Sequence, residues 1–200
     1  MGETATDTRS AAENFFGADV CGGKVYAQNR SVNVEESYPV AYNLGCGNKH
    51  WTGWINVDLG DDADLKSDLR TLPIKSDSAD AVAAIHVLEH FYHWEVPDVL
   101  KEWKRILKPG GKLILELPSM DKVMGYIAQC IAKKEDMERF MTLHAMYGDP
   151  MHKDPAMCHK WGWFMRELYA VLDEAGFRDI RYVTPRYHFA FRDQRFEAIK

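Results

Sequence analysis

Residues 40–49 read VAYNLGCGNK, and this stretch decides how the rest of the chain is organised. Its first five residues are mostly apolar, which is typical of a strand that is covered on both faces of a parallel sheet. Gly45 and Gly47 carry no Cβ atom, so a ligand can rest directly on the backbone of the turn that follows. The stretch therefore predicts a buried strand that ends in a ligand-binding turn.

A second short strand, INVD at residues 55–58, follows the glycine turn and ends in an acid. A glycine turn alone is weak evidence, but a carboxylate at the tip of the next strand is where ribose hydroxyls are bound in nucleotide-binding folds. Only residues 48–54 separate the two strands, which is too short for an ordinary crossover helix. We expect the first helix to be reduced to a turn.

Strands and helices alternate along the rest of the chain. Strands are expected at residues 65–69, 80–86, 112–117, 180–184 and 195–199, and helices at residues 95–107 and 163–175. This alternation predicts an α/β fold with a parallel sheet and right-handed connections. Ligands bind at the carboxyl ends of such strands, where Gly45, Asp58, Asp68 and His86 would converge.

The chain divides into an N-terminal extension, residues 1–38, and one main domain, residues 39–200. The extension is polar at its start and is expected to be partly disordered. Its second half either closes over a bound cofactor as a lid or covers a face of the sheet. Residues from about 120 to 160 form a helical insertion and an irregular loop, which we expect on the substrate side of the domain.

Composition excludes several classes of partner. The net charge of −5 and the pI near 5.9 argue against a general nucleic-acid binder, because neutralising phosphates requires a basic face. The longest apolar runs are too short to span a membrane. Four cysteines at positions 21, 46, 130 and 158 lack metal-ligand spacing, so we interpret them as reduced thiols of a cytoplasmic protein.

Five motifs occur in one order along the chain. They are NLGCG at 43–47, NVD at 56–58, DL at 68–69, HVLEH at 86–90 and LKPGG at 107–111. This order resembles the class I S-adenosylmethionine-dependent methyltransferases, and within them the small predicted methyltransferases of bacteria and phages. The resemblance implies a Rossmann-like, doubly wound and mostly parallel sheet of about seven strands. An antiparallel C-terminal strand, a shortened first helix and a helical insertion after the fifth strand complete the implied fold.

The resemblance also implies how the first strand and its turn would bind S-adenosylmethionine. The backbone of Gly45, Cys46 and Gly47 would hold the methionine part of the cofactor, and of the product S-adenosylhomocysteine. Asn43 stands where the family commonly has an acid, so it can hydrogen-bond but supplies no charge toward the cofactor's ammonium group. Lys49 stands where the family often has a third glycine.

The other cofactor contacts implied by the resemblance come from later strands. Asp58 would accept hydrogen bonds from both ribose hydroxyls, and Asp68 with Leu69 would border the adenine. His86 would lie near the sulfonium and the methyl acceptor.

Methyl transfer is an in-line displacement, so the enzyme aligns the two reactants and, for a hydroxyl acceptor, removes a proton. Histidine is the usual base near neutral pH. The histidines considered are His86, His90, His144, His152 and His159. Each of them could instead be a packing or surface residue. We favour His90 and His159 as catalytic, together with Glu89.

The spacing of His86, Glu89 and His90 would place all three on one helical face, as in some metal sites. A Glu-His pair at this point resembles the magnesium-assisted sugar O-methyltransferases, including those that act on RNA ends. Their first ligand is acidic, however, whereas this chain has His86, and imidazole is a poor ligand for magnesium. We therefore expect no metal ligands and no divalent metal.

The fourth strand lacks the Asn/Asp-Pro-Pro-aromatic signature of amino-group DNA methyltransferases, and no Pro-Cys pair for cytosine C5 methylation occurs. These features favour O-methylation of a small molecule or of a sugar or glycan. The alternatives are a metal-assisted RNA-end or sugar 2'-O-methyltransferase, and a non-catalytic protein that binds S-adenosylmethionine as a partner subunit or sensor. The arginines between residues 178 and 195 are expected on a solvated face.

Overall fold

The computed structural model describes residues 37–200. The predicted N-terminal extension, residues 1–38, lies outside the described residues except for its last two, and so does its role as a lid. Within the described part of the chain, no helix has the length and apolar character needed to cross a membrane.

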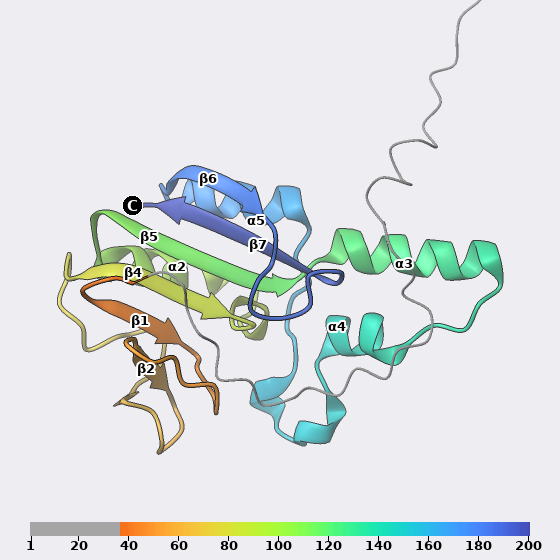
Figure 1. The fold of residues 1–200 in the computed structure, drawn as a ribbon, viewed down its shortest axis with the longest axis horizontal. Helices are drawn as coiled ribbons and strands as arrows, with labels where there is room; N and C mark the ends of the chain where they lie inside the picture. The colour runs from red at the N-terminus through yellow and green to blue at the C-terminus, as the bar shows by residue number, and fades with distance from the viewer. Residues whose placement is uncertain (1–36) are drawn as a thin grey trace, which may run out of the picture. The chain divides into compact units, whose positions relative to one another are not determined.

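Seven strands form one sheet in the order β3-β2-β1-β4-β5-β7-β6, as Figure 1 shows for most of them. Their bounds are β1 Ala41–Leu44, β2 Ile55–Asp58, β3 Leu65–Lys66, β4 Ala79–Ile85, β5 Leu107–Pro118, β6 Arg178–Val183 and β7 Asp193–Ile199. Strands β1 to β5 are parallel, and β7 is antiparallel to both β5 and β6. The strand order reverses between β1 and β4, which is where such sheets bind ligands. The predicted α/β sheet and its antiparallel C-terminal strand are confirmed.

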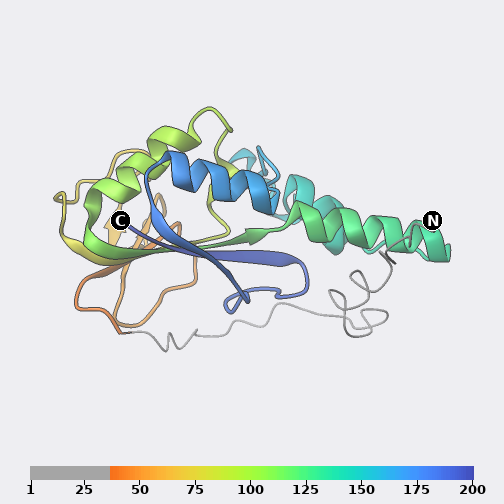
Figure 2. The same ribbon diagram turned by 90° about the horizontal axis from the view of Figure 1, so that it is seen from above.

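The helices are α2 Val96–Ile106, α3 Met120–Lys133, α4 Leu143–Tyr147 and α5 Met165–Glu174, with short 3-10 turns η1 Leu88–His90, η2 Arg139–Met141, η3 Pro150–His152 and η4 Pro155–Met157. Figure 2 shows α2 and α5 on the same face of the sheet. Apolar residues of α2 recur at helical spacing and are fully buried there, with Trp103 among them. The indole of Trp103 donates a hydrogen bond to the carbonyl of Leu69 over 3.0 Å.

The opposite face of the sheet is covered by the loop between β1 and β2. Trp51 and Trp54 of this loop pack edge to face, with ring centroids 5.0 Å apart. They are buried against alanines of β1 and β4, whose small side chains leave room for the indoles. Two tryptophans thus cover the area that a crossover helix would otherwise cover, in agreement with the prediction of a helix reduced to turns.

Two predicted elements are shorter than expected. The third strand ends at Lys66 rather than Leu69, because the side chain of Asp68 accepts a hydrogen bond from the backbone of Arg70 and closes a turn. The helical insertion is divided, since α3 ends at Lys133 and the next residue, Lys134, adopts the left-handed conformation before η2 and α4 follow. Figure 1 shows α3 continuing outward from the end of β5.

Candidate functional site

The glycine turn after β1 approaches β2 and the end of β4 closely. Gly45 has a φ of +65° and donates a hydrogen bond to the carbonyl of Val57 over 2.8 Å. A Cβ atom on Gly45 would lie 2.5 Å from Cγ2 of Val87. Gly47 also has a positive φ, of +51°, but a Cβ placed on it would meet no described atom within 4 Å. The turn is therefore packed at its first glycine and open at its second.

Asp58 at the end of β2 is held against this turn. Its Oδ2 atom accepts a hydrogen bond from the backbone of Gly47 over 2.9 Å, and its Oδ1 atom accepts one from Gly60 over 3.1 Å. Each carboxylate oxygen has a second lone pair. The carboxylate is thus oriented by the backbone and keeps acceptor capacity for a ligand.

Asn43 holds the loop that replaces the first helix. Its Nδ2 atom donates to the carbonyl of Lys49 over 3.1 Å and to Oδ1 of Asn56 over 3.0 Å. Asn56 in turn accepts a hydrogen bond from the backbone of Trp51 and donates one to Asp64. An acid at position 43 could not donate to the Lys49 carbonyl, so the amide is the side chain that this short loop requires.

A cavity of about 60 Å³ adjoins the turn, at the carboxyl ends of β1 and β4. Its walls are formed by Asn43, Gly45, Cys46, Lys49, Trp51, Ile85, His86, Tyr187 and His188. Four of the predicted cofactor-binding residues are therefore brought together here. The volume has room for about two water molecules. The segment that carries Tyr187 and His188, between β6 and β7, limits its size.

Asp58, Asp68 and Leu69 lie outside the walls of this cavity. A methyl of Leu69 would contact a Cβ atom on Gly45 at 3.5 Å, so Leu69 borders the turn. Asp68 is half-exposed and pairs with Arg70 through an Nη1 to Oδ2 distance of 3.1 Å. Asp68 is thus engaged by its own turn.

Glu116 of β5 fixes the segment that closes the cavity. Its two carboxylate oxygens accept hydrogen bonds from three consecutive backbone amides, those of Arg186, Tyr187 and His188, over 2.7 to 3.0 Å. The side chain is fully buried, and burial raises the pKa of Glu116 in spite of these donors. The carboxyl group acts as an internal anchor for the backbone.

His86 follows β4 directly and adopts a left-handed φ of +56°. Its Nε2 atom lies 2.8 Å from Oδ2 of Asp193, and its Nδ1 atom lies 3.1 Å from Oε1 of Glu89. Burial alone would lower the pKa of His86, but the two carboxylates outweigh it and raise this pKa to about 9. His86 is therefore an imidazolium between two buried acids.

Asp193 at the start of β7 accepts several hydrogen bonds. Its Oδ1 atom accepts from Nε of Arg192 over 2.8 Å, and its Oδ2 atom accepts from Nδ1 of His188 and from the backbone of Phe189, each over 3.0 Å. Burial would raise the pKa of Asp193, but His86 and these donors hold it well below its usual range. Burial lowers the pKa of His188 to about 4, so His188 is neutral.

The three residues predicted to be catalytic lie together beyond His86. Glu89 is 2% exposed, and ligand-type atoms of Glu89, His90 and His159 lie within 4.8 Å of one another. The His90 and His159 rings meet edge to face, with centroids 4.9 Å apart. Burial would raise the pKa of Glu89, yet the neighbouring imidazoles, His86 first among them, lower it to about 2. Burial lowers the pKa of His159.

The insertion supplies one half of this cluster. The backbone carbonyl of Glu89 accepts hydrogen bonds from the amides of Lys160 and Trp161 over 2.7 and 3.3 Å. His159 Nδ1 donates to the carbonyl of Ala145 over 2.9 Å, and His90 Nδ1 donates to the carbonyl of Cys158 over 3.3 Å. The segment before α5 is thus tied to η1.

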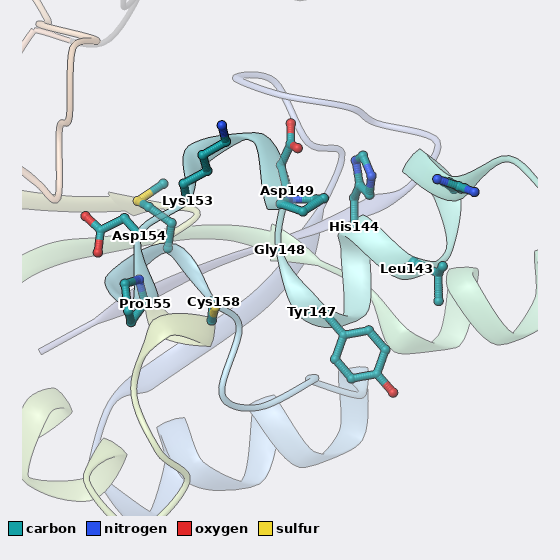
Figure 3. Close-up of a pocket in the computed structure, with 12 residues that line it drawn as sticks. Leu143, His144, Tyr147, Gly148, Asp149, Lys153, Asp154, Pro155 and Cys158 are labelled. Atoms are coloured by element: carbon teal, nitrogen blue, oxygen red, sulfur yellow. The ribbon is translucent and has the colours of Figure 1, made fainter.

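A larger pocket of about 500 Å³ lies within the insertion, between residues 139 and 158. Figure 3 shows Leu143, His144 and Tyr147 on α4, with Lys153 on the segment that follows. Cys158 forms part of the wall. Because the carbonyl of Cys158 accepts from His90, this pocket adjoins the Glu89, His90 and His159 cluster.

Comparison with known proteins shows what part of this chain resembles. Residues 42–115 match the family model described as a methyltransferase domain. No curated protein sequence matches the chain.

Solved structures match across most of the chain. An S-adenosylmethionine-dependent methyltransferase from Thermotoga maritima, described as a possible histamine N-methyltransferase, has a TM-score of 0.53 at 16% identity over 80% of this chain and 82% of that one. An S-adenosylmethionine-dependent methyltransferase from Archaeoglobus fulgidus has a TM-score of 0.52 at 16% identity over 80% of this chain and 85% of that one. The 1,6-didemethyltoxoflavin-N1-methyltransferase of Burkholderia thailandensis, with bound S-adenosylhomocysteine, has a TM-score of 0.54 at 14% identity, over 80% and 70%.

At these identities the structural likeness concerns the fold. Residues 42–115 are thus similar to a methyltransferase domain, and the chain shares its fold with S-adenosylmethionine-dependent methyltransferases.

Proposed function

We propose that the protein is an O-methyltransferase whose acceptor is a hydroxyl of a small molecule or of a sugar or glycan. The observation that carries this proposal is the cluster of buried Glu89 with partly buried His90 and His159 beside the insertion pocket. A hydroxyl acceptor needs a group that takes its proton, whereas alignment alone is enough for a neutral amine. This cluster supplies such a group at the edge of the sheet where the class binds its cofactor.

The glycine turn fits the cofactor. The open space above Gly47 and the oriented carboxylate of Asp58 suit the ribose, and Lys49 in the cavity wall offers a cation for the carboxylate of the methionine part. When bound, S-adenosylmethionine supplies the electrophilic methyl group. A cavity of about 60 Å³ is too small for a methionyl chain. Tyr187 and His188 would therefore move outward when the cofactor enters.

His159 is the favoured proton acceptor. Its Nδ1 donates to a backbone carbonyl, which fixes the tautomer and leaves the lone pair on Nε2. That Nε2 atom lies 3.9 Å from Oε1 of Glu89, so the carboxylate would stabilise the imidazolium that forms. His86 connects this cluster to the cofactor cavity, because it lines the cavity and contacts Glu89.

The insertion pocket is the proposed acceptor site. Tyr147, which is 63% exposed, offers a flat ring against which a sugar or another cyclic acceptor can lie. Arg139, Lys153 and Asp154 add polar and charged contacts around it. An aromatic ring with several hydrogen-bonding groups suits a polyhydroxylated acceptor better than an apolar one. The free thiols of the described cysteines agree with a reducing compartment, and we propose the cytoplasm.

The test is transfer of radiolabelled methyl from S-adenosylmethionine to a panel of sugars, glycans and phenols, with amines included because two similar structures are named for nitrogen acceptors. His159→Ala should lower turnover by about 10²- to 10⁴-fold while S-adenosylhomocysteine binds as in the wild type. His152→Ala, an exposed histidine of the same insertion, is the matched control. Wild-type turnover in both His90→Ala and His159→Ala would overturn the assignment of the base.

A further inference from the structure

We infer that Glu89, His90 and His159 form a binding site for one divalent transition-metal ion of the zinc type. This inference rests on the proposed function, because it concerns the same cluster and explains how that cluster would activate a hydroxyl. It departs from the expectation from sequence that no divalent metal is bound. The donor set is two imidazoles and one carboxylate, which is a common set in catalytic zinc sites.

The tautomers of both histidines are set by backbone carbonyls. Nδ1 of His159 lies 2.9 Å from the carbonyl oxygen of Ala145, and Nδ1 of His90 lies 3.3 Å from that of Cys158. A carbonyl only accepts, so each Nδ1 carries the proton and each neutral ring has its lone pair on Nε2. Histidine ligands of metals are oriented in this way, with the second ring nitrogen bonded to a carbonyl or carboxylate.

Glu89 is a buried acceptor beside the Nε2 atom of His159. Its Oε2 atom has no hydrogen-bond partner among residues 37–200, and its Oε1 atom has His86 Nδ1 at 3.1 Å, although the side chain is 2% exposed. The Nε2 atom of His159 lies 3.9 Å from Oε1. Oε2 of Glu89 and the Nε2 lone pair of His159 are neighbouring acceptors without a donor of their own, and a cation between them would satisfy both. The gap between them is therefore a position for a cation.

The dimensions suit an ion after a small closure. The ligand-type atoms lie within 4.8 Å of one another. Ligands that share an ion at about 2.1 Å are at most about 4 Å apart, so the three side chains need to close by about 1 Å. Imidazole nitrogens favour zinc, cobalt and similar ions over magnesium.

His86 belongs to the surroundings of this site rather than to its ligands. Both of its ring nitrogens face carboxylates, at 2.8 Å to Asp193 and 3.1 Å to Glu89, so no lone pair is left for an ion. It orients Glu89 as an outer partner orients a ligating carboxylate. The neighbouring group of His86, His188 and Asp193 makes a poorer site, because its atoms already bond one another over 2.8 and 3.0 Å.

An ion with three protein ligands keeps a further position for the acceptor hydroxyl. A cation lowers the pKa of a hydroxyl that it binds, so the O–H bond breaks and the proton passes to solvent. The hydroxyl oxygen would then form a bond to the methyl carbon as the C–S bond of S-adenosylmethionine breaks, and S-adenosylhomocysteine would leave. In this arrangement the two imidazoles are ligands, so the ion activates the hydroxyl, and the Nε2 lone pair of His159 binds the ion instead of taking the proton as proposed for the metal-free cluster.

The experiment is calorimetric titration of the metal-stripped full-length protein with Zn²⁺, and with Co²⁺ followed by its visible absorption. We expect one ion per chain, and at least about 100-fold weaker binding in His159→Ala and Glu89→Gln. Two variants outside the ligand set, His152→Ala and His188→Ala, should bind as the wild type does. Mg²⁺ at the same concentrations should not compete.

Several outcomes would overturn the inference. They are no stoichiometric binding by the wild type, loss of binding in His188→Ala but not in His159→Ala, and a Co²⁺ spectrum that is identical in wild type and His90→Ala. If Glu89→Gln does not fold, His159→Gln and anomalous scattering at the zinc edge from crystals of the wild type replace it. Stoichiometric metal binding without methylation of any hydroxyl would contradict the proposed function but not the metal site. Full turnover by the metal-free protein would contradict the metal site but not the proposed function.

Discussion

The imidazole of His86 joins Asp193 to Glu89, with its Nε2 atom 2.8 Å from one carboxylate and its Nδ1 atom 3.1 Å from the other. Asp193 lies 107 residues away along the chain. Through this ring, the start of β7 is connected to η1, and the cavity beside the glycine turn is connected to the cluster beside the insertion pocket. The first two predictions concern this connection.

Asp193→Asn should destabilise the protein by about 3–5 kcal/mol, because it leaves the His86 imidazolium and the Arg192 guanidinium without their buried carboxylate. Asp193 is fully buried and pairs with Arg192 over 2.8 Å. Urea unfolding followed by circular dichroism measures the change. Asp61→Asn is the control, since the side chain of Asp61 is 93% exposed in its pair with Lys66. A similar loss of unfolding free energy in Asp193→Asn and Asp61→Asn would contradict a stabilising role for the contact between Asp193 and His86.

Asp193 should also contribute to acid stability. Its folded pKa is held well below the ordinary value of 3.8, so its contribution is present above that value and is lost as the pH falls through the folded pKa. Below pH 3.8 the unfolded chain takes up a proton at Asp193 while the folded chain does not. The stability difference between the wild type and Asp193→Asn should therefore narrow by up to about 1.4 kcal/mol per pH unit. If the unfolding free energies of the wild type and Asp193→Asn change in parallel from pH 6 to pH 3, the pKa of Asp193 does not differ between the folded and unfolded chains.

The two glycines of the turn should differ in their tolerance of alanine. Both have a positive φ, which costs a side chain about 1–2 kcal/mol. Gly45→Ala adds an overlap with Val87 at 2.5 Å, worth about 1–3 kcal/mol more, whereas Gly47→Ala meets open space. Gly45→Ala should therefore have a lower melting temperature than Gly47→Ala in thermal unfolding. Adding Val87→Ala should restore part of the loss in the first variant and none in the second.

Local patterns were sufficient to predict the sheet. The apolar run before Gly45, the acid at Asp58 and the alternation of strands and helices are properties of neighbouring residues, and each strand they predicted occurs in the structure. The third strand was predicted too long because the turn made by Asp68 with Arg70 depends on a side-chain hydrogen bond that periodicity does not show. Of the residues expected to converge at one sheet edge, Gly45 and His86 line one cavity, whereas Asp58 and Asp68 lie outside its walls.

The half of the site that comes from the end of the chain was not predicted. Arg192 and Arg195 stand in a segment that was expected on a solvated face, yet both are buried, Arg192 against Asp193 and Arg195 near Glu116. Their environment depends on pairing between β5 and β7, which a charge pattern along one segment does not reveal. His188 and Asp193 were missed for the same reason. Among the cavity residues that were not predicted, Lys49 could have been found from the sequence, because it is a cation within the stretch that contains the glycine turn.

The thiol of Cys46 should be inert although it lines the cavity. Burial, followed by the charge of Asp58, raises its pKa to about 11, so almost none of it is thiolate at pH 7.5. Cys158 is exposed. Iodoacetamide followed by peptide mass spectrometry should find modification at Cys158 and none at Cys46 within the same period. Equal labelling would mean that the turn opens readily, and Cys158→Ser would then isolate the reaction at Cys46.

Tyr187→Ala should speed cofactor binding. Tyr187 contacts Trp51 at a centroid distance of 4.5 Å, and both close the cavity of about 60 Å³ beside Gly45. Removing the ring opens this space, so the association rate of S-adenosylhomocysteine should rise, while loss of the enclosing contact should raise the dissociation rate as well. Stopped-flow tryptophan fluorescence, to which Trp51 in the cavity wall contributes, measures both rates. Tyr182→Ala, on β6 and outside the cavity wall, is the matched control. If the two variants bind at the wild-type rate, the segment between β6 and β7 does not control entry, and the cofactor enters beside Gly47 instead.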